Sequence, residues 1–182
     1  GQIKAYYENR SKLYDQIIIC AGSWSKQLAQ MVGDKFPLDT ERGYHVLFNN
    51  AEKLINRPIG WSKSGFYIVQ IEEGIRAAGS VEIGGLKTQL NQKRLKMIER
   101  ESRKLLPTLG RVKSTWLGFR PTLPDSMPVI GQSNKNNKVY YAFGHQHIGW
   151  TLAGLTGKAI QYLIEGQEPN FDLSPFNPGR FE

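Results

Sequence analysis

"VYYAFGHQHIGWTLAGLTGKAIQYLIEG", residues 139–166, holds a strand, a glycine-rich turn and a helix in direct succession. The apolar run that ends at Gly144 is typical of a strand buried on both faces. Residues 148–165 are predicted to form a helix that Gly166 stops. Such a turn places free backbone N–H groups and the positive end of a helix dipole at the carboxyl edge of a sheet. That edge favours an electron-rich ligand, and Gly144 and Gly149 would let a flat ligand approach the backbone.

The same stretch contains His145 and His147, two of the chain's three histidines. A metal site needs at least three protein ligands, and the third histidine, His45, is distant in the sequence. No HExxH motif or cluster of carboxylates accompanies the pair. The sequence therefore predicts no metal site here.

The composition indicates a soluble globular protein, because 182 residues with 40% hydrophobic content can bury a substantial core. No apolar run approaches the roughly 20 residues of a membrane helix, and the first residues lack the apolar region of a signal peptide. The single cysteine, Cys20, excludes an internal disulfide. Its place in the run "IIIC" predicts a buried side chain.

Most of the net charge of +8 arises between residues 91 and 113. The apolar residues of this segment fall close to one helical face, interrupted by Ser102: Leu95, Ile98, Leu105 and Leu106. This pattern predicts a solvated amphipathic helix packed on a sheet. No aromatic residues interleave the charges, which disfavours nucleic-acid binding. A docking face for an acidic protein or a membrane surface, at residues 91–104, stays open as an alternative function.

The first third of the chain predicts a strand followed by a helix. "YDQIIICAG" is a short apolar run that suits a strand buried on both faces. "SWSKQLAQMVG" suits a helix that Gly33 stops, with Ser23 or Ser25 as N-cap. Its inward-facing residues are expected to be Leu28, Ala29 and Val32.

The middle of the chain, from Gly43 to about Gly85, consists of strand-like pieces separated by turn residues, which predicts an antiparallel sheet. The basic helix follows and Pro107 ends it, after which "STWLGFR" resumes an extended chain. The expected fold is mixed α/β, with a middle block inserted between two parts of one α/β domain.

"GFRPTLPDSMPVIG", residues 118–131, surrounds a single arginine with three prolines and two glycines. This rigid backbone would hold Arg120 in place, so that its guanidinium could bind a carboxylate or phosphate in bidentate fashion. A structural pairing of Arg120 with Asp125 is the alternative, and local sequence does not separate the two.

Four blocks in this order resemble the C-terminal half of the FAD-dependent D-amino acid oxidase and dehydrogenase superfamily. They are "DQIIICAGSWSKQLA", "PLDTERGYHVLF", "GFRPTLPDSMPVIG" and "VYYAFGHQHIGWTLAGLTGKAIQYLIEGQEP". The similarity is greatest to D-amino acid dehydrogenases of the bacterial small-subunit type, with glycine oxidase and sarcosine oxidase as more distant relatives. The resemblance implies part of an FAD-binding Rossmann-like domain (residues 1–37 and 111–182) and an antiparallel-sheet substrate domain (residues 38–110).

The resemblance also implies the site residues. Arg120 matches the arginine that grips the substrate carboxylate, and Tyr44, His45, Tyr67 and His147 are expected to line the substrate pocket. The expected FAD-binding residues are Ala21, Gly22, Trp24, Gly118, Gly131, Gly144, His145, Ile148, Gly149, Trp150 and Thr151.

One expected motif does not occur in the chain. The family opens with a G-x-G-x-x-G turn that binds the FAD pyrophosphate, and no such spacing of glycines is found here. We therefore expect a missing N-terminal half of the FAD domain, either as further chain or as a separate polypeptide. The other expected partners are a small amino acid and an electron acceptor, oxygen or a membrane quinone. The expected location is the cytoplasm, with peripheral association at the inner membrane left open.

Overall fold

The computed structural model describes residues 2–49 and 53–181 and divides the chain into two compact units. The first unit comprises Gly1–Asp39 and Arg120–Glu182, and the second comprises Thr40–Phe119. The sequence-based prediction assigned residues 111–119 to the FAD-binding domain. In the structure these residues belong to the second unit. The reason is that strand β8 (Val112–Thr122) joins the sheet of that unit.

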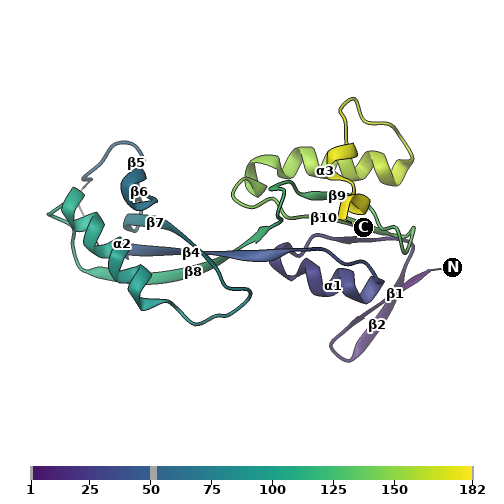
Figure 1. Cartoon of the computed structure of the whole chain (residues 1–182), viewed down its shortest axis with the longest axis horizontal. Coiled ribbons are helices and arrows are strands. Elements are labelled where there is room, and N and C mark those ends of the chain that lie inside the picture. Colours follow the sequence, from purple (N-terminus) through teal and green to yellow (C-terminus); the bar gives the residue numbers. More distant parts are fainter. Residues whose placement is uncertain (1, 50–52, 182) are drawn as a thin grey trace. The chain divides into compact units, whose positions relative to one another are not determined.

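A three-stranded sheet forms the centre of the first unit (Figure 1). Its middle strand, β10 (Val139–Phe143), pairs in parallel with β3 (Ile17–Ile19) and antiparallel with β9 (Val129–Gln132). The two predicted buried strands are thus neighbours, although they are far apart in the sequence. Together with the helices they confirm the predicted mixed α/β class.

Helices cover opposite faces of this sheet (Figure 1). Ala29 of α1 (Ser25–Val32) packs in one core with Tyr141 and other alternate residues of β10. Ile160 of α3 (Gly149–Glu165) packs in a separate core with Tyr140. Successive strand residues point to opposite faces, so each helix contacts every second residue of β10.

The start of α1 corrects the sequence interpretation. Trp24, and neither Ser23 nor Ser25, is the N-cap, because a 3-10 turn, η1 (Gly22–Trp24), runs directly into the helix. Gly33 ends the helix in the left-handed conformation, as predicted (φ +104°). Ala29 is fully buried, whereas Leu28 is 40% exposed, so the prediction of Leu28 as an inward-facing residue was wrong.

Two features of the first unit have no counterpart in the sequence-based prediction. The N-terminal residues form an antiparallel hairpin of β1 (Ile3–Tyr7) and β2 (Arg10–Tyr14). The C-terminal residues form two 3-10 turns, η3 (Ser174–Phe176) and η4 (Pro178–Phe181).

A buried carboxylate ties the end of α1 to the sheet. Asp34 accepts hydrogen bonds from the Ser133 hydroxyl and from the Tyr141 hydroxyl, the latter at 2.6 Å. The side chain of Asp34 is only 5% exposed. Burial, followed by the hydrogen bond to Asp34, raises the pKa of Tyr141. The phenol therefore stays protonated and remains a donor to the carboxylate.

Replacing Tyr141 with phenylalanine should lower the free energy of unfolding by about 1 to 3 kcal/mol, because it leaves a buried carboxylate short of one donor. Urea unfolding of the wild type and the variant measures this. Tyr140→Phe is the control, since its hydroxyl lies beside the partly exposed Gln132 amide. Equal losses in the two variants would contradict a specific role of the Asp34 bond.

The second unit is a five-stranded sheet in the order β5-β6-β7-β4-β8. The remaining strands are β5 (Ile59–Trp61), β6 (Phe66–Ile71), β7 (Gly74–Ile83) and β4 (Asp39–Phe48), with the 3-10 turn η2 (Ser62–Ser64) before β6. The pairings β5–β6, β6–β7 and β7–β4 are antiparallel, as the sequence predicted. One face packs on α2 (Gln92–Leu105) through a core that includes Phe48, Ile68 and Ile98.

Helix α2 confirms the predicted amphipathic pattern: Leu95, Ile98 and Ser102 are buried. Several of its cations form ion pairs, including Arg103 with Glu99 at 3.0 Å and Lys104 with Glu101 at 2.8 Å. The basic segment therefore has the properties of a solvated helix surface. Within the part of the chain that the structure describes, no helix has the length and apolar character needed to cross a membrane.

Candidate functional site

The carboxyl edge of the parallel strand pair brings two predicted segments together. Ile19 and Tyr141 are opposite each other in the register, and both strands end within a few residues. Because parallel strands end at the same edge, the turn Ala21–Trp24 and the turn that begins at Gly144 lie at this edge. In open α/β sheets, ligands bind at this position.

Gly144 adopts a backbone conformation that other residues rarely adopt (φ +90°). A Cβ atom here would lie 2.6 Å from Cδ1 of Leu123, so a side chain has no room. Glycine is therefore required for the chain to turn at the end of β10.

Helix α3 begins four residues beyond His145 with an uncapped first turn. Ile148 is the N-cap, and no side-chain hydrogen bond caps the helix in the described structure. The amides of Gly149, Trp150 and Thr151 therefore point out of the helix end with the positive end of its dipole. Trp150 is 97% exposed, which leaves this surface open to a ligand.

The two histidines of this turn differ in their environment. The imidazole Nε2 of His145 lies 2.9 Å from the Thr156 hydroxyl, which ties the turn to α3, and burial lowers the pKa of His145. His147 is exposed. Among residues 2–49 and 53–181, no group of three His, Cys, Asp or Glu side chains could hold a metal ion.

The opposite turn is also open to a ligand. Gly22 has a positive φ of +55°, and no described atom lies within 4 Å of the place that its Cβ would occupy. Trp24, two residues further along the turn, is 50% exposed. A flat aromatic ligand could thus approach the backbone at Gly22.

Two glycines that the resemblance assigns to the cofactor have neighbours that fill their free side. A Cβ at Gly118 would lie 2.1 Å from the ring of Trp116, and one at Gly131 would lie 2.4 Å from Cδ of Pro178. The absence of a side chain at Gly118 makes room for the Trp116 ring, and its absence at Gly131 makes room for Pro178.

Arg120 is half-buried near the end of β8. Asp125, its proposed structural partner, accepts hydrogen bonds from the Arg180 guanidinium, with a distance of 2.7 Å from Nε. It also accepts one from the Met127 amide at 3.1 Å. These hydrogen bonds of Asp125 hold the C-terminal turn η4 against the proline-rich segment of residues 118–131.

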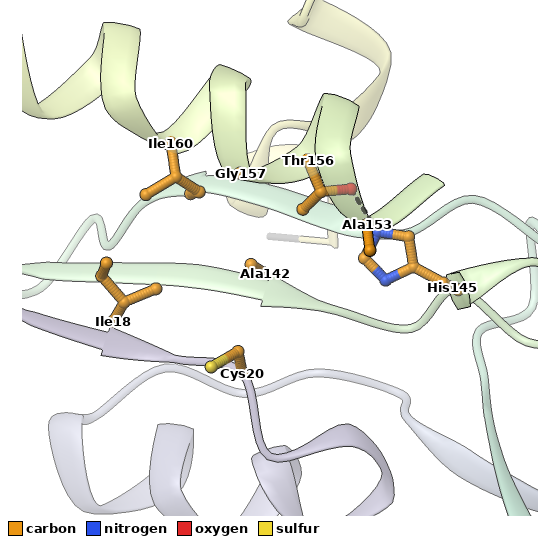
Figure 2. A pocket seen from close by; sticks show the side chains of 9 residues that line it. Ile18, Cys20, Ala142, His145, Ala153, Thr156, Gly157 and Ile160 are labelled. Carbon is orange, nitrogen blue, oxygen red and sulfur yellow. Dashed lines mark hydrogen bonds between the residues drawn. The ribbon is translucent and has the colours of Figure 1, made fainter. Parts of the chain in front are cut away.

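A groove runs from His145 along α3 over the sheet (Figure 2). Its volume is about 410 Å³, and Gly149, Ala153 and Gly157 form its helical wall. Ile18 and Cys20 of the β3 segment form the opposite wall. Cys20 is exposed, so the prediction that it is buried was wrong; its side chain lines this open groove. A second groove of about 710 Å³ lies on the other face of β3, between α1 and the hairpin.

The predicted pocket residues of the second unit occupy opposite faces of its sheet. Tyr44 is 1% exposed and lies in the core against α2, with its hydroxyl donated to Glu82. His45 and Tyr67 lie on the other face, where Tyr67 is 66% exposed. The structure thus places Tyr44 in the core, and a bulge between Arg42 and Tyr44 sets this phase of β4.

Trp116 is a residue that the sequence interpretation missed. Its indole stacks on the His45 ring with a centroid distance of 5.3 Å and an interplanar angle of 17°. An aromatic residue two positions before a glycine in the strand "STWLGFR" was the available signal, because only glycine leaves room for the ring.

A family model described as "FAD dependent oxidoreductase" matches residues 2–163. The chain belongs to this family. A D-amino-acid oxidase of Bradyrhizobium diazoefficiens is 39% identical over 92% of this chain and 41% of its own length. A D-amino acid dehydrogenase of Granulibacter bethesdensis is 29% identical over 99% of this chain and 44% of its own length.

The fold also agrees with that of a solved structure. The crystal structure of glycine oxidase from Geobacillus kaustophilus superimposes with a TM-score of 0.84 at 24% identity, over 93% of this chain and 46% of that one. The chain thus spans less than half the length of each of these three relatives. The resemblance stated from the sequence is confirmed, and FAD is the cofactor of the family.

Proposed function

We propose that this chain forms one wall of the active site of an enzyme that oxidises the C–N bond of a D-amino acid with FAD. The observation that carries the proposal is the edge at which the Gly22 and Gly144 turns meet the uncapped start of α3. Membership of the FAD dependent oxidoreductase family and the two D-amino acid relatives support it.

Three features of this edge fit the cofactor. The open side of Gly22 admits a flat ring, the exposed Trp24 and Trp150 offer apolar surface, and the first amides of α3 offer donors. The residues proposed to hold it are Ala21, Gly22, Trp24, Gly144, His145, Ile148, Gly149, Trp150 and Thr151. When bound, FAD supplies the acceptor for the hydride, two electrons and a proton, that leaves the substrate α-carbon.

The amides of α3 would donate to the pyrimidine edge of the flavin. Together with the helix dipole they favour negative charge at that edge, without any need for reorganisation. The turn before these amides is held by backbone hydrogen bonds, from the Gln146 amide to the Pro121 carbonyl at 3.1 Å and from the Ile148 amide to the His145 carbonyl at 3.0 Å. These bonds would fix the donors before a ligand binds.

Arg120 would bind the substrate carboxylate. Two parallel hydrogen bonds from the planar guanidinium would fix the orientation of the carboxylate. The α C–H bond would then be held in one direction, which makes the hydride transfer effectively intramolecular. The amine loses one proton, and the resulting imine takes up water to give a 2-oxo acid and ammonia. Oxygen or a quinone would take up the two electrons at the end of the cycle.

The test is anaerobic mixing of the full-length protein with single D- and L-amino acids, followed by flavin absorbance. We expect bleaching of the flavin by D-amino acids and formation of the 2-oxo acid and ammonia in equal amounts. Oxygen uptake with peroxide formation would identify an oxidase, and reduction of a quinone analogue without oxygen uptake would identify a dehydrogenase. A flavin that no amino acid reduces would overturn the proposal.

The open edge of β3 is the surface where we propose that the rest of the FAD domain packs. Parallel strands are normally covered on both faces, yet Ile18 on β3 is 44% exposed and a groove lies on either side of the strand. The α3 residues that line the first groove include Gly149, Ala153 and Gly157, whose small size would let a second helix approach α3 closely. A polypeptide equivalent to the unmatched part of the relatives would fill both grooves.

The isolated residues 1–182 should bind FAD at least about a hundredfold more weakly than the complete protein, which corresponds to about 2.8 kcal/mol. The reason is that only one wall of the site is present, without a G-x-G-x-x-G turn for the pyrophosphate. Fluorescence titration of FAD measures both affinities. Equal affinities would contradict the incomplete site.

A further inference from the structure

The second unit carries almost all of the chain's net charge. Residues 40–119 hold 14 of the 24 lysines and arginines but only 7 of the 16 aspartates and glutamates, so this unit accounts for +7 of the net charge of +8. Such an excess creates a positive potential, and a cleft lined by one sign of charge focuses it. A cavity of this unit that is lined by cations is therefore a favoured place for an anion to bind.

One such cavity lies beside the segment that leads into β5. Its volume is about 190 Å³. The residues that line it are Lys53, Ile55, Asn56, Arg57 and Pro58, together with Val69 and Gln70 of β6. Three of them, Lys53, Asn56 and Arg57, have exposed side chains that can donate hydrogen bonds. The cavity thus has one wall of hydrogen-bond donors and one wall of strand β6.

The backbone of the donor wall is anchored to the sheet. The Leu54 amide donates a hydrogen bond to Oε1 of Gln70 at 3.2 Å. Ile55 is 8% exposed and belongs to the core of the second unit. Pro58 restricts the residue before it, Arg57, to an extended backbone. Binding of an anion therefore requires little ordering of the backbone in this segment.

The two cations of the cavity lack a counter-charge in the described structure. Within residues 2–49 and 53–181, neither Lys53 nor Arg57 forms an ion pair with another side chain. The described residues that line the cavity include no acidic one, and Glu72 and Glu73 lie in the turn after β6, outside the lining. The lining of the cavity thus carries two positive charges and, among its described residues, no negative one.

The charge and the number of acceptor atoms favour a phosphate group over a carboxylate. A phosphate monoester carries about −1.5 to −2 charges at pH 7 and has three strong acceptor oxygens. A carboxylate carries one charge and has two oxygens. The planar fork of Arg57 can bind two phosphate oxygens at once, and Lys53 and Asn56 can donate to the third.

The size of the cavity limits what can enter it. Pockets for drug-sized ligands have volumes of about 300 to 1,000 Å³, whereas this cavity has a volume of about 190 Å³. It can therefore hold a small anion or the charged end of a larger molecule.

We propose that this cavity binds a phosphate group, held by the Arg57 guanidinium, the Lys53 ammonium and the Asn56 amide. The group belongs to free phosphate or to the headgroup of an anionic lipid, since both present the same oxygens. These three residues are not among those proposed to bind FAD or the amino acid, so the inference does not depend on the proposed function.

The test is calorimetric titration of the FAD-loaded full-length protein with inorganic phosphate at low ionic strength. Bound FAD keeps the added phosphate out of the cofactor site. Arg57→Gln should weaken phosphate binding by at least about tenfold, which corresponds to about 1.4 kcal/mol, because it removes charged donors. Acetate should bind at least about tenfold more weakly than phosphate, since it has one charge and two oxygens.

Sedimentation with vesicles distinguishes the two sources of the phosphate group. Vesicles of phosphatidylcholine with phosphatidic acid present the group on a lipid, and vesicles of phosphatidylcholine alone are the reference. If the ligand is a headgroup, the protein should sediment with the first vesicles, and Arg57→Gln should lose this association. If the ligand is free phosphate, Arg57→Gln should weaken binding in the calorimeter instead.

Lys53→Gln and Lys63→Gln form a matched pair of variants. Both remove one exposed lysine of the second unit, but Lys63, in η2, does not line the cavity. Lys53→Gln should weaken binding, whereas Lys63→Gln should leave it unchanged. Equal losses in the two variants would overturn the site, because they would show a general effect of charge. Acetate binding as tight as that of phosphate, or no binding of either phosphate or phosphatidic acid vesicles, would also overturn it.

Discussion

Replacing Arg120 with leucine in the full-length enzyme is expected to lower kcat/KM for its amino acid substrate. The change should correspond to a loss of about 2 to 5 kcal/mol of transition-state stabilisation. The substitution removes, at a half-buried position of β8, the positive charge that we propose pairs with the substrate carboxylate. Most of the effect should appear as a higher KM, because the carboxylate is bound in the ground state as well as in the transition state. Steady-state kinetics with a D-amino acid measure it.

Two further variants make this result specific. Arg120→Lys keeps the charge but loses the planar fork, so it should recover only part of the loss. Arg111→Leu removes an exposed arginine just before the same strand and should leave the kinetics unchanged. If Arg120→Leu has wild-type kinetics, Arg120 does not bind the substrate.

Replacing Gly144 with alanine is expected to destabilise the chain by about 2 to 4 kcal/mol and to reduce the FAD content of the full-length protein. Two costs add: the backbone is held at φ +90°, and the new Cβ would lie 2.6 Å from Cδ1 of Leu123. Relief of the clash would move the turn that carries the α3 amides. Urea unfolding of the chain and flavin absorbance of the purified enzyme measure the two effects.

Gly154→Ala is the matched control, because it makes the same substitution inside α3 at a position with no described atom within 4 Å of the new Cβ. It should be neutral or stabilising by up to about 1 kcal/mol, as alanine favours the helix. A Gly144→Ala variant as stable as this control would contradict the requirement for glycine at the turn.

The strand, turn and helix of residues 139–166 were predictable because every signal is local. An apolar run, a glycine at each end of the connection and a periodic apolar face lie within one segment. The structure has β10 ending at Phe143 and α3 ending at Glu165, with Gly166 in the left-handed conformation. The same holds for α2, where Pro107 and the spacing of Leu95 and Ile98 mark the helix.

Burial was less predictable, since it depends on which parts of the protein cover a residue. Cys20 and Leu28 lie on apolar segments but remain exposed, because both line the open groove between α1 and the hairpin. The sequence-based prediction also missed the N-terminal hairpin, for a different reason. Its strands carry charged and aromatic residues without apolar alternation, and the pairing of Ile3 with Tyr14 is set across the turn.

The faces of β4 illustrate a third limit. "GYHVLF" has apolar or aromatic residues at nearly every position, so alternation alone does not tell whether Tyr44 or His45 faces the core. The bulge between Arg42 and Tyr44 decides it, together with Glu82, which accepts the Tyr44 hydrogen bond and the Asn91 amide at 2.8 Å. These partners come from strands and loops far along the chain.

The most direct test of the central claim is a crystal structure of the full-length protein with FAD and a bound amino acid. We predict the pyrimidine edge of the flavin at the amides of residues 149–151, the turn of residues 21–24 against the cofactor, and the Arg120 guanidinium on the substrate carboxylate. A flavin bound away from the carboxyl edge of β3 and β10, with no contact to either turn, would contradict the account.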